Sequence, residues 1–189
     1  IADITEAMDK HGFTQALNPE LLELVTDENG RIFGVPVGSV YAQGLFINKK
    51  LFRDAGLTDE EGYPMIPKTY EELAETAKII KEKTGQPGFV FPTTNNVGGW
   101  HFMNIAWAYG VEFMEQEESG KWKAIFDTQE CRNALQYIKD LKWKYDVLSD
   151  NSVIDLAEAK KLFATGQGAM MFNTPPSSDL ATSYGTVSY

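Results

Sequence analysis

Apolar residues recur along this chain at two spacings, one typical of amphipathic helices and one typical of short buried strands. The clearest helical pattern is TYEELAETAKII, which starts at a capping box made by Thr69 and Glu72. Gly85 follows this pattern, as is common at the end of a helix. The pattern therefore predicts a helix over about residues 70–84.

Other segments carry the same helical spacing. Short helices are predicted over NPELLELV and over LFRDAGL, and the second of these ends at Gly56. A further helix is predicted over HFMNIAWAYG. It follows a loop, NNVGGW, and ends at Gly110. Asp127 and Glu130 form a second capping box, and the helix predicted last along the chain stops at Gly166. The apolar positions of these last two helices are Ala134, Leu135, Ile138 and Leu141, and then Leu156, Ala159 and Phe163.

Short apolar runs between these helices predict strands, and the alternation of the two predicts an α/β fold class. One predicted strand, RIFGVPV, follows an Asn-Gly turn, and another, GLFINKKLF, follows GSVYAQ, a stretch of small and polar residues with one tyrosine. The segment EFMEQEESGKWKAIF predicts a hairpin around Ser119 and Gly120. GFVFPTT and GAMMF are typical of buried strands. In open α/β sheets ligands bind beyond the carboxyl ends of strands, so TTNNVGGW and NTPPSS are candidate binding loops.

Composition narrows the classes of function. The net charge is −10, and the basic residues are interleaved with acids, which argues against nucleic acid as a partner. No apolar stretch is as long as a membrane span. Cys131 is the only cysteine, so neither an internal disulfide nor a cysteine metal cluster is available.

Patterns for metal binding and catalysis are not found. His11 and His101 are far apart and lie in no metal-binding motif, so we expect no metal site and no cofactor. The 27 acidic residues cluster on predicted helix surfaces, whereas TTNNVGGW and NTPPSS contain none. Because glycoside hydrolysis needs two carboxylates across a cleft, this distribution argues against catalytic residues.

The candidate loops are instead rich in amides and aromatic rings. Trp100 follows Asn95 and Asn96 in a glycine-rich loop, and Tyr41 stands among small residues. Aromatic faces stack on sugar rings while amides bond the hydroxyl groups, so this inventory suits a sugar. Packing is an equal alternative for Trp100, and it is the preferred interpretation of the other tryptophans, Trp107, Trp122 and Trp143.

In chain order, the segments GRIFGVP, GLFINKKLF with AGL, PKTYEEL, FDTQECRNALQYIKDL and EAKKLFATGQGAMMFN extend over nearly the whole chain. This series resembles the extracellular solute-binding protein family 1 of ABC importers, which includes maltose- and multiple-sugar-binding proteins. The resemblance implies a periplasmic-binding-protein-like II fold, in which two lobes close on a sugar. It implies an internal fragment with the tail of the first lobe at 1–38, the inter-lobe crossing at 39–43, and most of the second lobe at 44–189.

The resemblance also implies function and partners. The ligand would be a sugar or oligosaccharide, and the partner would be the membrane permease of an ABC importer, with no reaction catalysed. The protein would be a monomer outside the cytoplasm, extracellular or periplasmic, and its full-length form would be anchored as a lipoprotein. A binder of another solute, such as a polyamine, iron or an anion, is the alternative on the same fold, and a carbohydrate-active enzyme is the alternative from another class.

Site residues follow from the same resemblance. The crossing implies a ligand contact at Tyr41 with Ser39 and Gln43 beside it, although an ordinary turn with a packed tyrosine is the alternative. The loop before the next helix implies contacts from Asn95, Asn96 and Trp100. The loop that begins at Thr174 lacks the aromatic residue that the family commonly has there, which leaves Thr174 as a polar contact and Trp100 as the expected stacking residue.

Overall fold

The chain forms two compact units, Ile1–Tyr41 and Ala42–Tyr189. The computed structural model describes residues 1–36 and 43–174. The division between the units falls within the predicted crossing at 39–43, of which only Gln43 belongs to the described residues. Within those ranges, no helix is long and apolar enough to span a membrane.

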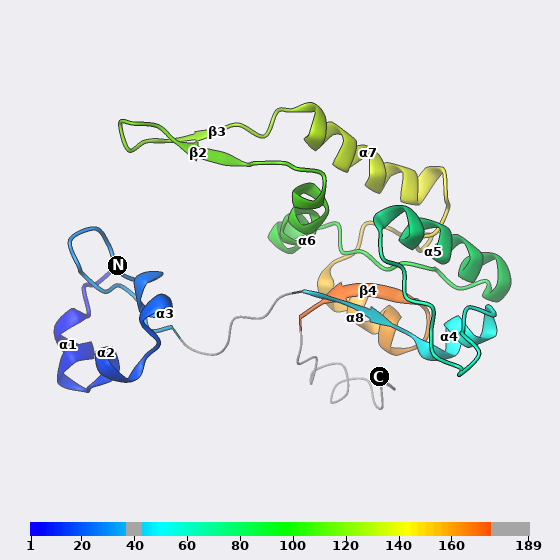
Figure 1. The fold of residues 1–189 in the computed structure, drawn as a ribbon, viewed down its shortest axis with the longest axis horizontal. Helices are drawn as coiled ribbons and strands as arrows, with labels where there is room; N and C mark the ends of the chain where they lie inside the picture. Colours follow the sequence, from blue (N-terminus) through cyan, green and yellow to red (C-terminus); the bar gives the residue numbers. More distant parts are fainter. Residues whose placement is uncertain (37–42, 175–189) are drawn as a thin grey trace. The chain divides into compact units, whose positions relative to one another are not determined.

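The first unit consists of short helices followed by a turn. Its helices are α1 (Thr5–Lys10), α2 (Phe13–Ala16) and α3 (Pro19–Glu23) (Figure 1). Asn18 starts α3, since its side chain accepts a hydrogen bond from the Glu20 N–H, and Pro19 suits the first helical position. Gly30 closes the following turn with a φ of 77°, a conformation that glycine adopts without strain.

The strand expected over RIFGVPV does not form within its described residues, 31–36, where Ile32 makes an isolated bridge with Thr26. Ile32 is buried, and its N–H donates to the Thr5 hydroxyl at 2.8 Å. Its carbonyl accepts from the Ile4 N–H at 2.9 Å. Ile32 therefore ties the turn to the start of α1 instead of joining a sheet.

The second unit is organised by two strands that are distant in the sequence. β1 (Gly44–Ile47) pairs antiparallel with β4 (Met170–Asn173), with Gly44 opposite Asn173 and Ile47 opposite Met170 (Figure 1). The predicted strands in GLFINKKLF and GAMMF are therefore present, and they pair with each other.

The strand expected over GFVFPTT is reduced to a single parallel bridge between Val90 and Met171. The Val90 N–H donates to the Met170 carbonyl at 2.8 Å, and the neighbouring Phe89 N–H donates to Val147 instead. Pro92 has no N–H to extend the ladder. The segment nevertheless lies against β4 and is buried, as the sequence pattern indicated.

Helices surround this ribbon. They are α4 (Lys49–Asp54), α5 (Tyr70–Thr84), α6 (Asn95–Ala108), α7 (Gln129–Trp143) and α8 (Leu156–Ala164). The helix predicted over 70–84 is confirmed as α5, where the Thr69 hydroxyl accepts from the Glu72 N–H and Gly85 ends the helix with a φ of 72°. The Glu72 carboxylate completes the cap by accepting from the Lys68 N–H at 2.7 Å.

Two details of α7 differ from the expectation. The residue that caps its start is Thr128, whose side chain accepts from the Cys131 N–H, whereas Asp127 pairs with Arg132 at 2.6 Å. Leu135, expected on the apolar face, is 53% exposed. The buried face instead includes Tyr137, which is one helical turn from Ala134 and from Leu141.

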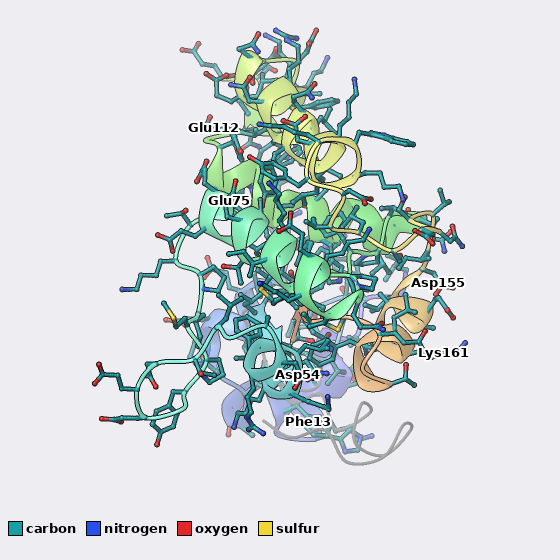
Figure 2. All side chains as sticks on the ribbon, turned by 90° about the vertical axis from the view of Figure 1, so that its right-hand side faces the viewer. Phe13, Asp54, Glu75, Glu112, Asp155 and Lys161 are labelled. Atoms are coloured by element: carbon teal, nitrogen blue, oxygen red, sulfur yellow. The ribbon has the colours of Figure 1, made fainter. Side chains whose placement is uncertain are left out.

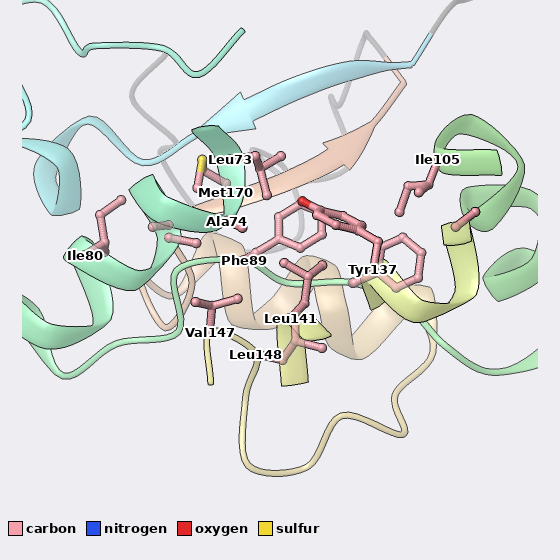
Figure 3. Packing of buried hydrophobic residues seen from close by; sticks show 14 of the residues in the cluster. Leu73, Ala74, Ile80, Phe89, Ile105, Tyr137, Leu141, Val147, Leu148 and Met170 are labelled. Atoms are coloured by element: carbon pink, nitrogen blue, oxygen red, sulfur yellow. The ribbon is translucent and has the colours of Figure 1, made fainter. Parts of the chain in front are cut away.

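The two faces of the ribbon pack into different parts of the core, because side chains alternate along a strand. Leu45 and Phe172 pack against the cluster that α5, α6 and α7 build, which includes Phe89 and Leu141 (Figure 3). Phe46 and Met171 face the other way and pack with residues of α8, among them Phe163. The rings of Phe46 and Phe163 meet edge to face, with centroids 6.5 Å apart.

Outside this core lie a hairpin and a charged surface. The predicted hairpin is confirmed, since β2 (Met114–Gln116) pairs antiparallel with β3 (Trp122–Ala124). The carboxylates labelled in Figure 2, such as Asp54, Glu75 and Asp155, lie exposed on three separate helices or their caps. The acidic groups are therefore spread over the surface of the second unit.

Two neighbouring glycines in α6 differ in how closely they pack, because only Gly98 lies against the backbone of Thr93. A Cβ added to Gly98 would lie 2.6 Å from the Thr93 carbonyl carbon, whereas a Cβ on Gly99 would meet no atom within 4 Å. We expect Gly98→Ala to destabilise the protein by about 1–3 kcal/mol through overpacking. The matched control, Gly99→Ala, should stabilise it by about 0.5–1 kcal/mol because alanine favours helix. Urea unfolding midpoints that move in the same direction for both variants would contradict this packing.

The buried imidazole of His101 gives a prediction about pH. Burial, and to a smaller degree the positive charge of Lys160, lower the pKa of His101 to about 4, from an ordinary value near 6.5. Between these two pH values the unfolded chain binds a proton that the folded chain does not, so folding stability falls as the pH drops from about 6.5 toward 4. Urea unfolding at pH 7 and pH 5 should therefore show a smaller loss of stability for His101→Leu than for the unmodified chain. An equal loss of stability in the two proteins would contradict this prediction.

Candidate functional site

Two of the expected binding residues meet at one end of the β1–β4 ribbon. Gly44 begins β1 opposite Asn173, the last residue of β4, so Gln43 and Thr174 flank the same end of the pair. Asn173 is buried, and its side-chain oxygen accepts from the Thr174 N–H at 2.9 Å. The antiparallel register thus brings Gln43 and Thr174 together although they are far apart in the sequence.

Helix α6 lies beside this end of the ribbon. The Asn104 side-chain N–H donates to the Gln43 side-chain oxygen at 2.5 Å, and it also approaches the His101 carbonyl at 3.3 Å. Asn104 was not among the ligand-binding residues expected from the sequence. The available signal was the pair His101 and Asn104, two polar residues three positions apart within an otherwise apolar part of the helix.

Trp100 lies on the same helix, one turn before Asn104 and about 6 Å from it along the axis. Its side chain is 49% exposed, and its ring meets that of His101 edge to face at 5.5 Å. The predicted glycine-rich loop is wrong, since Trp100 belongs to α6, which begins at Asn95. The helix starts early because Gly98 fits closely against the Thr93 backbone and donates its N–H to the Thr94 carbonyl.

Asn95 and Asn96 occupy the first turn of α6 and are both exposed. Asn95 has a φ of 61°, a conformation that asparagine adopts more readily than most residues. The Thr94 side chain makes no capping hydrogen bond, so no side chain at that position covers the N–H groups of this turn. Asn96 is about 12 Å from Asn104 along the helix axis. Asn95 and Asn96 are therefore roughly two helical turns away from Asn104 and its partner Gln43.

The tryptophans assigned to packing are more exposed than a core position would be. Trp107, Trp122 and Trp143 are 56%, 65% and 77% exposed, so they lie on the surface of the second unit. Trp107 packs its edge against Phe113, and Trp143 lies near the ammonium of Lys142. Among the described residues, none of these three rings meets the ring of His101, whereas Trp100 does.

His101 is the most unusual group of the site. Its side chain is fully buried, and neither ring nitrogen has a hydrogen-bond partner within residues 1–36 and 43–174. The same holds for the side-chain nitrogen of Gln43. The low pKa of His101 keeps the imidazole neutral at physiological pH, so the site presents neutral donors and acceptors.

The elements that build the site carry no charge. α6, β1 and β4 contain no Asp, Glu, Lys or Arg. In the part of the chain that the structure describes, no cluster of His, Cys, Asp and Glu could hold a metal ion. Tyr41, expected to contact the ligand from the crossing, lies outside the described residues, as does Ser39. The geometry therefore offers an aromatic face, amides and a neutral imidazole at one place.

Known proteins share the sequence pattern and the fold of this chain. Residues 2–187 match the model of the family described as bacterial extracellular solute-binding protein. The maltose-bound MalE3 protein of T. maritima is 29% identical with a TM-score of 0.75, and the match covers 93% of this chain and 42% of that one. An ABC transporter solute-binding protein of Thermotoga lettingae, bound with alpha-D-tagatose, is 25% identical with a TM-score of 0.76, over 96% of this chain and 45% of that one.

A third similar structure is the cyclic alpha-maltosyl-1,6-maltose binding protein of Arthrobacter globiformis, 28% identical with a TM-score of 0.68. That match covers 98% of this chain and 44% of the other. The chain thus spans less than half the length of these three proteins. Its α/β fold is that of the periplasmic-binding-protein-like solute-binding proteins, and the chain belongs to the family of bacterial extracellular solute-binding proteins.

Proposed function

We propose that the protein binds a neutral sugar or oligosaccharide and delivers it to the permease of an ABC importer. The observation that carries this proposal is the exposed ring of Trp100 beside the uncharged polar cluster of Gln43, Asn104 and Thr174. A sugar presents C–H-rich ring faces and hydroxyl groups, and these two features match an aromatic face and amides. The three similar structures are named for, or hold, maltose, tagatose and a maltose-containing cyclic sugar.

The absence of charge from α6, β1 and β4 favours a neutral ligand over a polyamine or an anion. A polyamine site needs carboxylates and an anion site needs Arg or Lys, because a buried charge must be paired. Acid–base catalysis on a sugar needs paired carboxylates, which these elements also lack. The proposed role is therefore binding without a catalysed reaction.

The proposal includes the placement of the site between two lobes. Residues 1–38 would belong to the first lobe, 39–43 to the crossing, and 44–189 to the second lobe. The boundary between the compact units, at Tyr41 and Ala42, supports this division. Tyr41 and Gln43 would then lie in the crossing, Asn95, Asn96, Trp100 and Thr174 would line the second lobe, and closure of the lobes would bury the sugar.

Location and assembly follow from the same proposal. The protein would work outside the cytoplasm as a monomer, held near its permease by a lipid anchor on the full-length form. Closure on the ligand would present the surface that the permease recognises.

The test is removal of the Trp100 ring from the whole protein. Trp100→Ala should weaken binding of maltose, maltotriose or D-tagatose by about 1–3 kcal/mol, the scale of a lost aromatic contact. Isothermal titration calorimetry measures this loss directly. Trp143→Ala is the matched control, because it removes another exposed tryptophan, on α7, and should leave the affinity unchanged. Equal affinities of Trp100→Ala and the unmodified protein would contradict the assignment.

A further inference from the structure

Three buried side-chain nitrogens in the candidate site lack a hydrogen-bond partner among the described residues. They are the Gln43 Nε2 and both ring nitrogens of His101. Buried polar atoms in native proteins nearly always have a partner, and one without a protein partner calls for an explanation. These three atoms are the complete set of such side-chain atoms within residues 1–36 and 43–174, and they belong to neighbouring residues.

Elsewhere in residues 43–174, the buried side-chain nitrogens and oxygens have hydrogen-bond partners. The Tyr137 side chain is only 7% exposed, and its hydroxyl donates to the Tyr70 carbonyl at 2.6 Å. The unsatisfied atoms are therefore a local property of the site and not a general feature of this packing.

The rings around His101 define how this polar group is enclosed. Phe91 meets the imidazole edge to face at 6.3 Å, and Trp100 does so at 5.5 Å. Phe91 is buried, whereas Trp100 is half-exposed. Trp100 is therefore the solvent-exposed member of the two rings that meet His101, and Asn104 holds Gln43 next to the same helix turn.

We propose that His101 and the Gln43 side-chain nitrogen bind one hydroxyl group of the ligand, beneath the ring of Trp100. This inference rests on the proposed sugar-binding function and adds two polar contacts, with Asn104 as the residue that positions Gln43. His101 becomes a ligand-specificity residue instead of a core histidine.

The donor and acceptor pattern selects a hydroxyl group. A neutral imidazole offers one N–H donor and one acceptor nitrogen, and the amide nitrogen of Gln43 offers donors. A hydroxyl both donates and accepts, so it pairs with both kinds of atom, whereas a carboxylate only accepts and an ammonium only donates. A site built to bond a hydroxyl rejects an analogue that lacks it, because its own polar groups are then left unpaired.

The experiment compares two variants of the whole protein in a crossed design. His101→Leu removes a polar group without a protein partner, and Tyr137→Phe removes a buried hydroxyl that has one. Calorimetry with maltose, maltotriose and D-tagatose gives the affinity, and thermal unfolding of the ligand-free protein gives the Tm. We expect His101→Leu to lose at least tenfold in affinity with an equal or higher Tm, and Tyr137→Phe to keep its affinity with a lower Tm.

The outcomes separate this inference from the proposed function. If Trp100→Ala loses affinity and His101→Leu does not, the inference is overturned and the sugar-binding function stands. If His101→Leu loses both affinity and Tm, as a structural histidine would, the inference is also overturned. If the unmodified protein binds none of the three sugars, the function and the inference fall together.

A second measurement keeps the test independent of any substitution. The ring nitrogens of His101 in the ¹⁵N-labelled unmodified protein are followed by NMR as the tightest-binding of the three sugars is added. A hydrogen bond to the hydroxyl shifts the ¹⁵N resonance of the ring nitrogen that makes it, while the resonances of the exposed His11 stay in place. His101 resonances that do not move at saturating sugar would overturn the inference.

Discussion

The antiparallel pairing of β1 with β4 is the constraint on which the rest of the second unit depends. It joins residue 44 to residue 173 and so holds the intervening helices in one compact unit. Its two faces separate the core into a part covered by α5, α6 and α7 and a part covered by α8. Aromatic contacts fix the ribbon in place, since Phe172 meets both Tyr70 and Phe89 edge to face.

The same pairing creates the candidate site. Because the strands are antiparallel, the residue before β1 and the residue after β4 emerge at one end, where α6 passes. The helix contributes Trp100, His101 and Asn104 within about one turn, and the Asn104 side chain bonds Gln43 at the end of the ribbon. A neutral polar group, an aromatic face and a strand end are thus brought together by packing that also stabilises the fold.

Features that depend on local chemistry could be predicted from the sequence. The helix over 70–84 follows from a capping hydroxyl, an apolar repeat and a final glycine, and all three lie within the helix or next to it. The hairpin of β2 and β3 follows in the same way from its alternation and its central Ser-Gly. The family followed from the order of several motifs, and residues 2–187 match it.

Features that depend on distant contacts could not be predicted in this way. The start of α6 was mispredicted for a local reason, because its two asparagines and two glycines are poor helix formers, although Gly98 fits closely against the nearby Thr93 backbone. The bond from Asn104 to Gln43 spans 61 residues and leaves no local trace. GFVFPTT forms only one bridge because Pro92 has no N–H and the Phe89 N–H donates to the Val147 carbonyl. The ligand contacts expected from the sequence all remain predictions: Tyr41, Gln43, Asn95, Asn96, Trp100 and Thr174.

The central claim is that Trp100 and the polar cluster beside it form the surface that holds a sugar. The most direct measurement is a crystal structure of the whole protein grown with the tightest-binding of maltose, maltotriose and D-tagatose. We expect a sugar ring stacked on the face of Trp100, with hydroxyl groups within hydrogen-bonding distance of Gln43 and of the His101 ring. A sugar bound with no contact to Trp100, Gln43 or His101 would contradict it.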